Sequence, residues 1–312
     1  MLAYLVRRLL WGAAVVVTTA VLAYGMMRIL RPDLYGGEPL LTGVGGDLGA
    51  AFLHFDFGEA CGFPGCPVIR DLWSDSYVAD LSLLAGALVL GVTGGVAGGV
   101  LCATRPGSLA ARSLESTAMV LYCTPVYVLG LGLLLLFAPV FGIVPLPFFF
   151  EAHTYAPPLE NPWDWLRSLL LPSLVVGGPI SAACLRLTLA MSRDAMGEHF
   201  VRTATAKGLS RRQVVRRHAA PVAYPTLASF VAASVPAVVT NVVLVESVFS
   251  VPGFFRHTRR ALGQTAGGTL DIPTLQALAL WAAVLIVLMS LACDLALVVL
   301  DPRLRAAGRP PG

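Results

Sequence analysis

Charged residues are scarce in this chain. Asp, Glu, Lys and Arg account for 13% of its 312 residues, whereas hydrophobic residues account for 56%. A soluble domain usually carries about 25% charged residues, and a chain with half that share has too few of them to cover a water-facing surface. The shortage of charge therefore argues against a soluble protein and favours one that lies largely in a lipid bilayer.

The sequence also lacks the short motifs that mark several enzyme classes. It has no Gly-x-x-x-x-Gly-Lys-[Ser/Thr] loop to cradle nucleotide phosphates, no His-Glu-x-x-His and no Gly-x-Ser-x-Gly. All five histidines lie outside the long apolar runs, which argues against an intramembrane enzyme. We expect no catalytic residue, no metal site and no cofactor in this chain. Nucleic acid is not an expected partner either, because the sequence offers no basic face with stacking aromatic residues.

Six long apolar runs dominate the chain. A helix rises 1.5 Å per residue, so about 20 uncharged residues cross a hydrocarbon core of about 30 Å. Pro125 and Pro236 fall inside the third and fifth runs, where neighbouring helices can satisfy the carbonyls that each proline frees. Pro172, Pro179 and Arg186 interrupt the fourth run. We predict an all-α polytopic membrane protein with six transmembrane helices. Their expected ranges are 9–30, 81–103, 114–138, 169–191, 226–249 and 275–300.

The distribution of basic residues predicts which segments face the cytoplasm, since cytoplasmic loops are enriched in Lys and Arg. Arg7 and Arg8 precede the first run, which is too long for the apolar part of a cleaved signal peptide and is expected to remain as a span. With six spans, both termini and the connections 104–113 and 192–225 are cytoplasmic. Their basic residues are Arg7, Arg8, Arg105, Arg112, Arg193, Arg202, Lys207, Arg211, Arg212, Arg216, Arg217, Arg303, Arg305 and Arg309.

The connection 31–80, placed on the other side of the membrane, is rich in Asp and Glu and too long for a tight turn. We expect an N-terminal transmembrane helix at 1–30, an extracytoplasmic loop subdomain at 31–80 and a core of five transmembrane helices at 81–312. The outside loop before the last span departs from the charge rule, because it contains Arg256, Arg259 and Arg260.

Two cysteines lie in the outer loop. Cys61 and Cys66 are separated by Gly-Phe-Pro-Gly, and the Pro-Gly pair favours a chain reversal that would bring the sulfurs together. A disulfide fits the oxidising face of a membrane. Two idle thiols and a metal site are the alternatives.

A stripe of small residues, Gly91–Gly99, runs along the second expected span. Small residues four apart let helix backbones approach closely in lipid. The stripe therefore predicts close packing, either inside this chain or against a partner subunit.

The basic connection 192–225 carries the start signals of a short helix. Ser210 is a preferred N-cap, and Gln213, three residues on, completes a capping box. Leu209 before the cap and Val214 after it are spaced for a hydrophobic staple.

Gly208 stands where a preceding helix, at about 195–206, needs a left-handed residue to end. The second helix is expected to stop before the next span, at Pro221 and Pro225. A solvated basic loop that only sets topology is the alternative, but it would need none of these local signals. We interpret the connection as a docking element of defined structure.

The same segment resembles the cytoplasmic coupling motif of permeases in binding-protein-dependent ABC importers. The general motif is Glu-Ala-Ala, three residues, Gly, nine residues, Ile, any residue and Leu-Pro. Its frame falls on Arg202-Thr203-Ala204, Gly208, His218 and Ala220-Pro221, so four positions depart from it. However, Val-Arg-Thr-Ala-Thr-Ala-Lys-Gly-Leu-Ser is similar to the form found in the dipeptide and oligopeptide branch.

The resemblance covers nearly the whole chain. The opening Met-Leu-Ala-Tyr-Leu-Val-Arg-Arg-Leu-Leu is similar to the start of the first permease subunit of that branch. Three further segments resemble it: Phe55-Asp-Phe-Gly58, Glu246-Ser-Val-Phe-Ser-Val-Pro-Gly253 and the ending, with Asp294 followed by Leu300-Asp-Pro-Arg-Leu-Arg305. The acidic loop with its cysteines departs most from the family.

This resemblance implies a type I ABC importer permease of the bacterial plasma (inner) membrane, with a cytoplasmic coupling helix, a large extracytoplasmic loop and a permease core at 81–312. The implied partners are a second homologous permease subunit, two ATPase subunits or domains, and an extracytoplasmic substrate-binding protein, all at the lipid bilayer. ATP and magnesium would be bound by the ATPase partners. The residues implied in ATPase coupling are Arg202, Thr203, Ala204, Lys207, Gly208, Leu209, Ser210, Val214 and Pro221.

Three charged residues in the apolar runs are candidates for the translocation pathway. A charge near the middle of a span costs at least about 2.5–3.5 kcal/mol, so it usually faces protein or water. Arg186, Glu246 and Asp294 lie nearer the ends of their runs. An interfacial ion pair or a snorkelling side chain is the alternative for each.

The resemblance implies ATP-driven import of dipeptides or oligopeptides. A permease of the same class for nickel, haem or another small solute is an alternative, because specificity mostly belongs to the binding protein. A secondary transporter that works without ATP is the alternative from a different class. Such proteins often show an internal repeat, and the sequence shows no convincing one.

Overall fold

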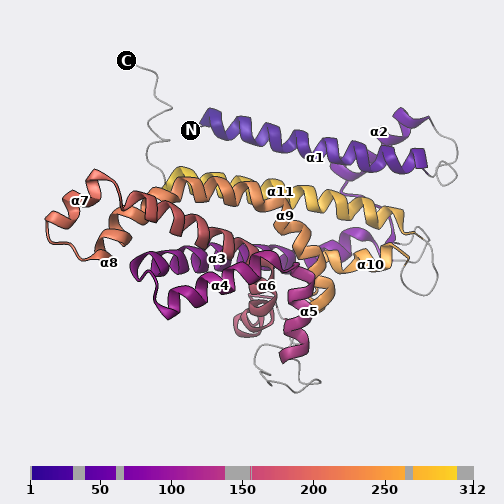
Figure 1. Ribbon diagram of the computed structural model, residues 1–312. Coiled ribbons are helices and arrows are strands. Elements are labelled where there is room, and N and C mark those ends of the chain that lie inside the picture. The colour runs from indigo at the N-terminus through magenta and orange to yellow at the C-terminus, as the bar shows by residue number, and fades with distance from the viewer. Residues whose placement is uncertain are drawn as a thin grey trace, which may run out of the picture. The chain divides into compact units, whose positions relative to one another are not determined.

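The computed structural model describes residues 2–30, 39–60, 67–137, 155, 157–263 and 270–300. Every regular element of these residues is a helix, and the only strand-like pairing among them is an isolated bridge between Glu59 and Val68 (Figure 1). The helices are α1 (Leu2–Leu30), α2 (Leu40–Leu53), α3 (Ile69–Thr104), α4 (Leu109–Cys123), α5 (Val126–Phe137), α6 (Pro162–Ala195), α7 (His199–Ala206), α8 (Arg211–Val214), α9 (Tyr224–Phe249), α10 (Thr258–Ala261) and α11 (Ile272–Leu300).

The chain divides into two compact units. The first unit comprises Met1–Leu81 and Ser250–Leu291, and the second comprises Ser82–Phe249 and Ala292–Gly312. Helices α3 and α11 contribute residues to both. The predicted division at residues 30 and 80 follows the expected membrane topology and stays a prediction.

Five helices of the described residues are long and apolar enough to cross a membrane, and α4 with α5 makes a sixth if this bent pair counts as one span. The all-α polytopic prediction is therefore confirmed. Helix α6 continues for 34 residues through Pro172 and Pro179, so these prolines do not end the fourth span. In the second unit, α6 packs against α4, α5 and α9.

The run 114–138, expected as one transmembrane helix with Pro125 inside it, is broken into two helices, α4 and α5. The chain bends by 116° between α4 and α5, at Thr124 and Pro125. Thr124 is extended, with φ −85° and ψ 126°, because the proline ring after it disfavours the helical region. Pro125 thus separates two helices instead of lying inside one.

The glycine stripe of α3 packs against α6 within the second unit. A Cβ atom on Gly91 would lie 2.8 Å from the carbonyl oxygen of Gly177. A Cβ atom on Gly177 would lie 2.5 Å from the carbonyl oxygen of Ala87. Only glycine allows the two backbones this distance, so the stripe serves packing inside this chain.

In the first unit, an ion pair joins α1 to α2. The guanidinium of Arg28 binds both carboxylate oxygens of Asp47, at 2.9 and 3.1 Å, and the Arg28 side chain is buried. Elsewhere in this unit, the fully buried carboxylate of Asp80 accepts hydrogen bonds from the backbone N–H of Phe254 and from Nε1–H of Trp281. Asp80 therefore links α3 to α11.

Backbone hydrogen bonds join the two chain segments that flank the cysteine pair. The N–H of Ala60 donates to the carbonyl of Pro67 at 2.9 Å, and the N–H of Ile69 donates to that of Gly58 at 3.1 Å. The predicted disulfide between Cys61 and Cys66 lies outside the described residues and stays a prediction.

Candidate functional site

Residues 198–223, which we call the coupling hairpin, connect α6 to α9 in the second unit (Figure 1). Gly208 ends α7 in the left-handed conformation, at φ +82°. The N–H of Gly208 donates to the carbonyl of Thr205 at 2.9 Å, and that of Leu209 donates to the carbonyl of Ala204 at 3.4 Å. This pair of bonds is a Schellman motif, so the predicted glycine stop is confirmed.

The predicted capping box opens α8. Gln213 accepts hydrogen bonds at Oε1 from the backbone N–H and from the hydroxyl of Ser210, both at 2.9 Å. These bonds use the N–H of Ser210, which would otherwise face water at the helix start. The hairpin therefore turns sharply and is held by its own side chains.

A small apolar core lies between the two arms of the hairpin. Val201, Ala204 and Val214 are buried in it, and Leu209 and Met196 pack against them. The predicted staple of Leu209 with Val214 is thus formed. Because this core is local, the hairpin has a fixed shape of its own.

A hydrogen bond and a buried apolar cluster are among the contacts that attach the hairpin to the rest of the second unit. Nη2 of Arg211 donates to the carbonyl oxygen of Ala103, in the last turn of α3, at 3.2 Å. Val215 is buried in a cluster with Cys102, Ala111 and Leu189. Sequence reasoning missed the role of Arg211, because its acceptor is 108 residues away.

The expected stop of the second helix at Pro221 is wrong. A π-helical segment, Val215–Ala219, and a 3-10 turn, Ala220–Ala223, lead from α8 into α9, and Arg211–Phe249 is continuous over 39 residues. Proline lacks an N–H and its ring collides with the carbonyl four residues before it. The wider π turn, in which the N–H of Ala220 bonds to the carbonyl of Val215, admits the ring without ending the helix.

The predicted coupling residues fall into two groups. Arg202, Thr203, Lys207, Gly208 and Ser210 are exposed, whereas Ala204 and Val214 are buried and Leu209 and Pro221 are half-buried. The buried group holds the shape of the hairpin. The exposed group is available to a partner.

The outer face of α8 forms a basic pocket of about 560 Å³, lined by Ser210, Arg212, Gln213, Arg216 and Arg217. Residues four apart share a helix face, which brings Arg212 beside Arg216. On α7, the aromatic ring of Phe200 is 45% exposed. Phe200 was not among the predicted site residues, although its position in a segment rich in Arg and Lys was a usable signal.

Two of the three predicted pathway residues, Arg186 and Glu246, lie far apart. Arg186, on α6, is exposed, and its guanidinium lies 5.7 Å from the ring centre of Tyr122 on α4. Glu246 and Asp294 are buried. Arg186 lies nine residues before the end of α6 and Glu246 lies 22 residues after the start of α9. The coupling hairpin joins those two helix ends, so the residues are about 20 Å apart along the helices.

These features define a polytopic helical membrane protein with a structured basic hairpin. Residues 95–306, more than half of the chain, match the family described as binding-protein-dependent transport system inner membrane component. The chain belongs to this family. It is therefore a multi-pass transport permease, of the kind that works with ATPase and substrate-binding partners.

Individual relatives are transport permeases as well. A protein of Sinorhizobium fredii named "Probable peptide ABC transporter permease protein" is 29% identical over 97% of this chain and 99% of its own. The dipeptide transport system permease protein DppB of Escherichia coli is 28% identical over 81% and 80%. The di/tripeptide transport system permease protein of Pseudomonas aeruginosa is 29% identical over 73% and 71%.

Proposed function

We propose that this chain is one permease subunit of an ATP-driven importer of dipeptides or oligopeptides in the bacterial plasma membrane. It would form half of the translocation pathway, and a second homologous permease would form the other half. The relatives named for peptide, dipeptide and di/tripeptide transport support this cargo class. The basic residues of the expected cytoplasmic segments support an orientation with both termini inside the cell.

The coupling hairpin would transmit the action of two ATPase subunits. The observation that carries this proposal is that the hairpin is closed by its own caps and core, and that α8 runs on into the transmembrane helix α9. A short helix presented in this way suits docking into a groove on a partner. When the ATPases close, the hairpin would shift and α9 would tilt, which is a rigid coupling between two states.

The chemistry of ATP hydrolysis would belong to the partners. No phosphate-binding loop occurs in the 312 residues, so ATP and magnesium would be bound by the ATPase subunits. The exposed residues Arg202, Thr203 and Lys207 would contact the ATPase. Glu246 and Asp294 are proposed to line the pathway or to brace it, since buried charges in a span usually have such roles.

A comparison of two glycines tests the coupling proposal. Gly208 and Gly107 both have a positive φ, +82° and +76°, and a Cβ atom on either would meet nothing within 4 Å. Alanine at either position therefore introduces a similar backbone strain of about 1–2 kcal/mol, but only Gly208→Ala distorts the coupling hairpin. In the assembled importer, Gly208→Ala should reduce ATP-driven uptake at least severalfold more than Gly107→Ala, at equal membrane levels. Equal uptake by the two variants would contradict the proposal.

The cargo is tested by competition. Uptake of a labelled dipeptide by the assembled importer should be suppressed by unlabelled dipeptides and oligopeptides, and not by nickel or haem. Suppression by nickel or haem alone would favour the alternative permease of the same class. Uptake that persists without any ATPase would favour a secondary transporter.

A further inference from the structure

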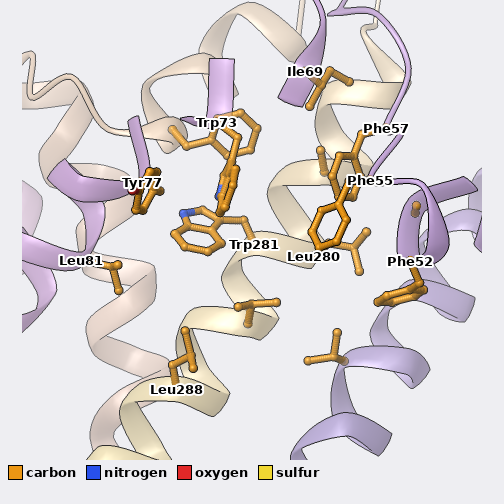
Figure 2. Close-up of a pocket in the computed structure, with 15 residues that line it drawn as sticks. Phe52, Phe55, Phe57, Ile69, Trp73, Tyr77, Leu81, Leu280, Trp281 and Leu288 are labelled. Atoms are coloured by element: carbon orange, nitrogen blue, oxygen red, sulfur yellow. The ribbon is translucent and has the colours of Figure 1, made fainter. Parts of the chain in front are cut away.

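The first unit contains an apolar cavity of about 470 Å³. Aromatic side chains gather around it: Figure 2 shows Trp73, Tyr77 and Trp281 on one side, and Phe52, Phe55 and Phe57 on another. The coupling hairpin and the pathway residues all belong to the second unit. The proposed transport function therefore leaves this cavity without a role.

The depth of the cavity matches one leaflet of a bilayer. Along α11, its lining runs from Ala277, near the start of the helix, to Leu288. Eleven residues of helix correspond to about 16 Å, and half of a hydrocarbon core is about 15 Å. The candidate span on α11 is Ile272–Ala296, so this lining lies within the part of the helix that would cross the hydrocarbon core.

The chemistry of the lining favours an alkyl chain. The fifteen side chains around the cavity are aliphatic or aromatic, and Nε1–H of Trp281 is donated to Asp80. A peptide in this cavity would lose hydrogen bonds from its backbone groups to water, and each such loss is costly. An alkyl chain has no such groups.

A basic cluster stands next to the cavity. Phe254 lines the cavity, and the residues that follow it include Arg256, Arg259 and Arg260, all exposed. The ring of His257 lies 6.0 Å from that of Phe254, so the cluster begins at the cavity wall. These arginines depart from the charge rule for membrane loops, and topology does not explain them.

Asp271, the first acidic residue after this cluster in the chain, is already engaged. Asp271 accepts hydrogen bonds from the N–H and the hydroxyl of Thr274, at 3.2 and 2.7 Å, and is buried. Burial, followed by the charges of Arg256 and Arg260, lowers the pKa of His257, and Asp271 only opposes this effect. Nε of Arg256 also donates to Nε2 of His257 at 3.4 Å, and the exposed guanidinium groups of Arg259 and Arg260 are suited to an anion.

We propose that the first unit binds an anionic phospholipid, with one acyl chain in the apolar cavity and the phosphate group on Arg256, Arg259 and Arg260. Basic residues at a membrane surface attract anionic lipids, and the aromatic side chains match the belt that Trp and Tyr form at the interface. This proposal rests on α11 being a span. It does not depend on the cargo or on the ATPases.

Tryptophan quenching by brominated lipids tests the proposal directly. Trp73 and Trp281 line the cavity, so a full chain carrying Trp11→Phe, Trp163→Phe and Trp165→Phe reports on its contents. This chain is reconstituted in phosphatidylcholine vesicles that contain a small fraction of phosphatidylglycerol, with bromine on the acyl chains of one lipid at a time. We expect stronger quenching by the brominated phosphatidylglycerol at equal mole fraction.

Variants separate the two parts of the site. Arg259→Gln with Arg260→Gln should lower the preference for phosphatidylglycerol by at least about fivefold, the effect of one basic residue at a membrane surface. Arg112→Gln, an exposed arginine of the second unit, is the matched control and should keep the preference. Ala277→Phe fills the cavity and should reduce quenching by both lipids, whereas Leu22→Phe, on an exposed part of α1, should not.

Three results would overturn the proposal. Equal quenching by the two brominated lipids in the reporter chain, with all arginines present, would show that no headgroup site exists. Recovery of fluorescence on adding an apolar tripeptide would mean that the peptide displaces the acyl chain, and the cavity would then be a binding site for cargo. A brominated fatty acid that binds as well as phosphatidylglycerol would show that a carboxylate suffices and that a phospholipid is not selected. If Ala277→Phe fails to fold, the arginine variants still test the proposal, because substitutions of exposed side chains should not prevent folding.

Discussion

Nη2 of Arg211 donates a hydrogen bond to the carbonyl oxygen of Ala103 at 3.2 Å, and this contact ties the first turn of α8 to the last turn of α3. The last carbonyls of a helix have no partner within it, so the arginine satisfies a group that would otherwise need water. The hairpin is thereby attached to α3, in addition to α6 and α9, the two helices that it connects.

Removing this bond should loosen the hairpin. For Arg211→Ala we expect local opening to become easier by about 1 kcal/mol, or roughly fivefold faster amide exchange in α7 and α8. Hydrogen–deuterium exchange measures the effect. Arg217→Ala is the matched control: it also removes one arginine charge, but from the basic pocket, and it should leave exchange unchanged. If both variants exchange alike, the Arg211 contact does not hold the hairpin.

Close packing of α3 on α6 should make Gly177 intolerant of alanine. Alanine favours a helix over glycine by about 1 kcal/mol, but its Cβ atom would lie 2.5 Å from the backbone oxygen of Ala87. We expect Gly177→Ala to lower the free energy of unfolding by roughly 1–3 kcal/mol, measured by denaturation in detergent. Gly132→Ala, where nothing lies within 4 Å, should be neutral or stabilising, and the prediction fails if the two variants are equally stable.

Replacement of Asp80 by asparagine should destabilise the first unit. The carboxylate accepts hydrogen bonds from Phe254 and Trp281, and an amide offers only one acceptor, so one buried N–H is left without a partner. The expected cost is about 1–3 kcal/mol, seen as a lower melting temperature and a changed emission of Trp281. Asp75→Asn, at an exposed position of the same helix, serves as the control. An equal effect of both substitutions would show that Asp80 does not join the helices.

Stability of the first unit should fall in mild acid. Burial, then Arg256 and Arg260, lowers the pKa of His257 below its ordinary value of 6.5. The unfolded chain therefore binds more protons at His257 than the folded chain, and stability decreases as the pH falls through 6.5 toward the lowered value. Melting temperatures at pH 7.5 and 5.5 test this. His257→Gln should reduce the difference, whereas His54→Gln, at an exposed position, should not.

The parts of the site that the sequence predicted are those with local causes. Gly208, Ser210 and Gln213 act on backbone groups within five residues, so their types and spacing suffice to predict the turn. The staple of Leu209 and Val214 is local in the same way. Six apolar runs likewise predicted the membrane class, because the length of a span depends only on bilayer thickness.

The effects of proline required the structure. Pro172 and Pro179 are accommodated within α6, Pro221 is accommodated by a π turn, and Pro125 ends a helix. In each case the surroundings decide which outcome is cheaper. The hydrogen bond between Arg211 and Ala103 could not be predicted from the sequence either. The order of the residues does not reveal which helix ends lie close together.

The unbroken path from Arg211 to Phe249 has a mechanical consequence. A rod of 39 residues is roughly 60 Å long, and pivoting it by about 10° moves its far tip by about 10 Å. Glu246 is three residues from that tip. A push on the arginines at one end of this path would therefore displace a carboxylate at the other end, and bending at the π turn, Val215–Ala219, or at Pro236 would reduce the displacement.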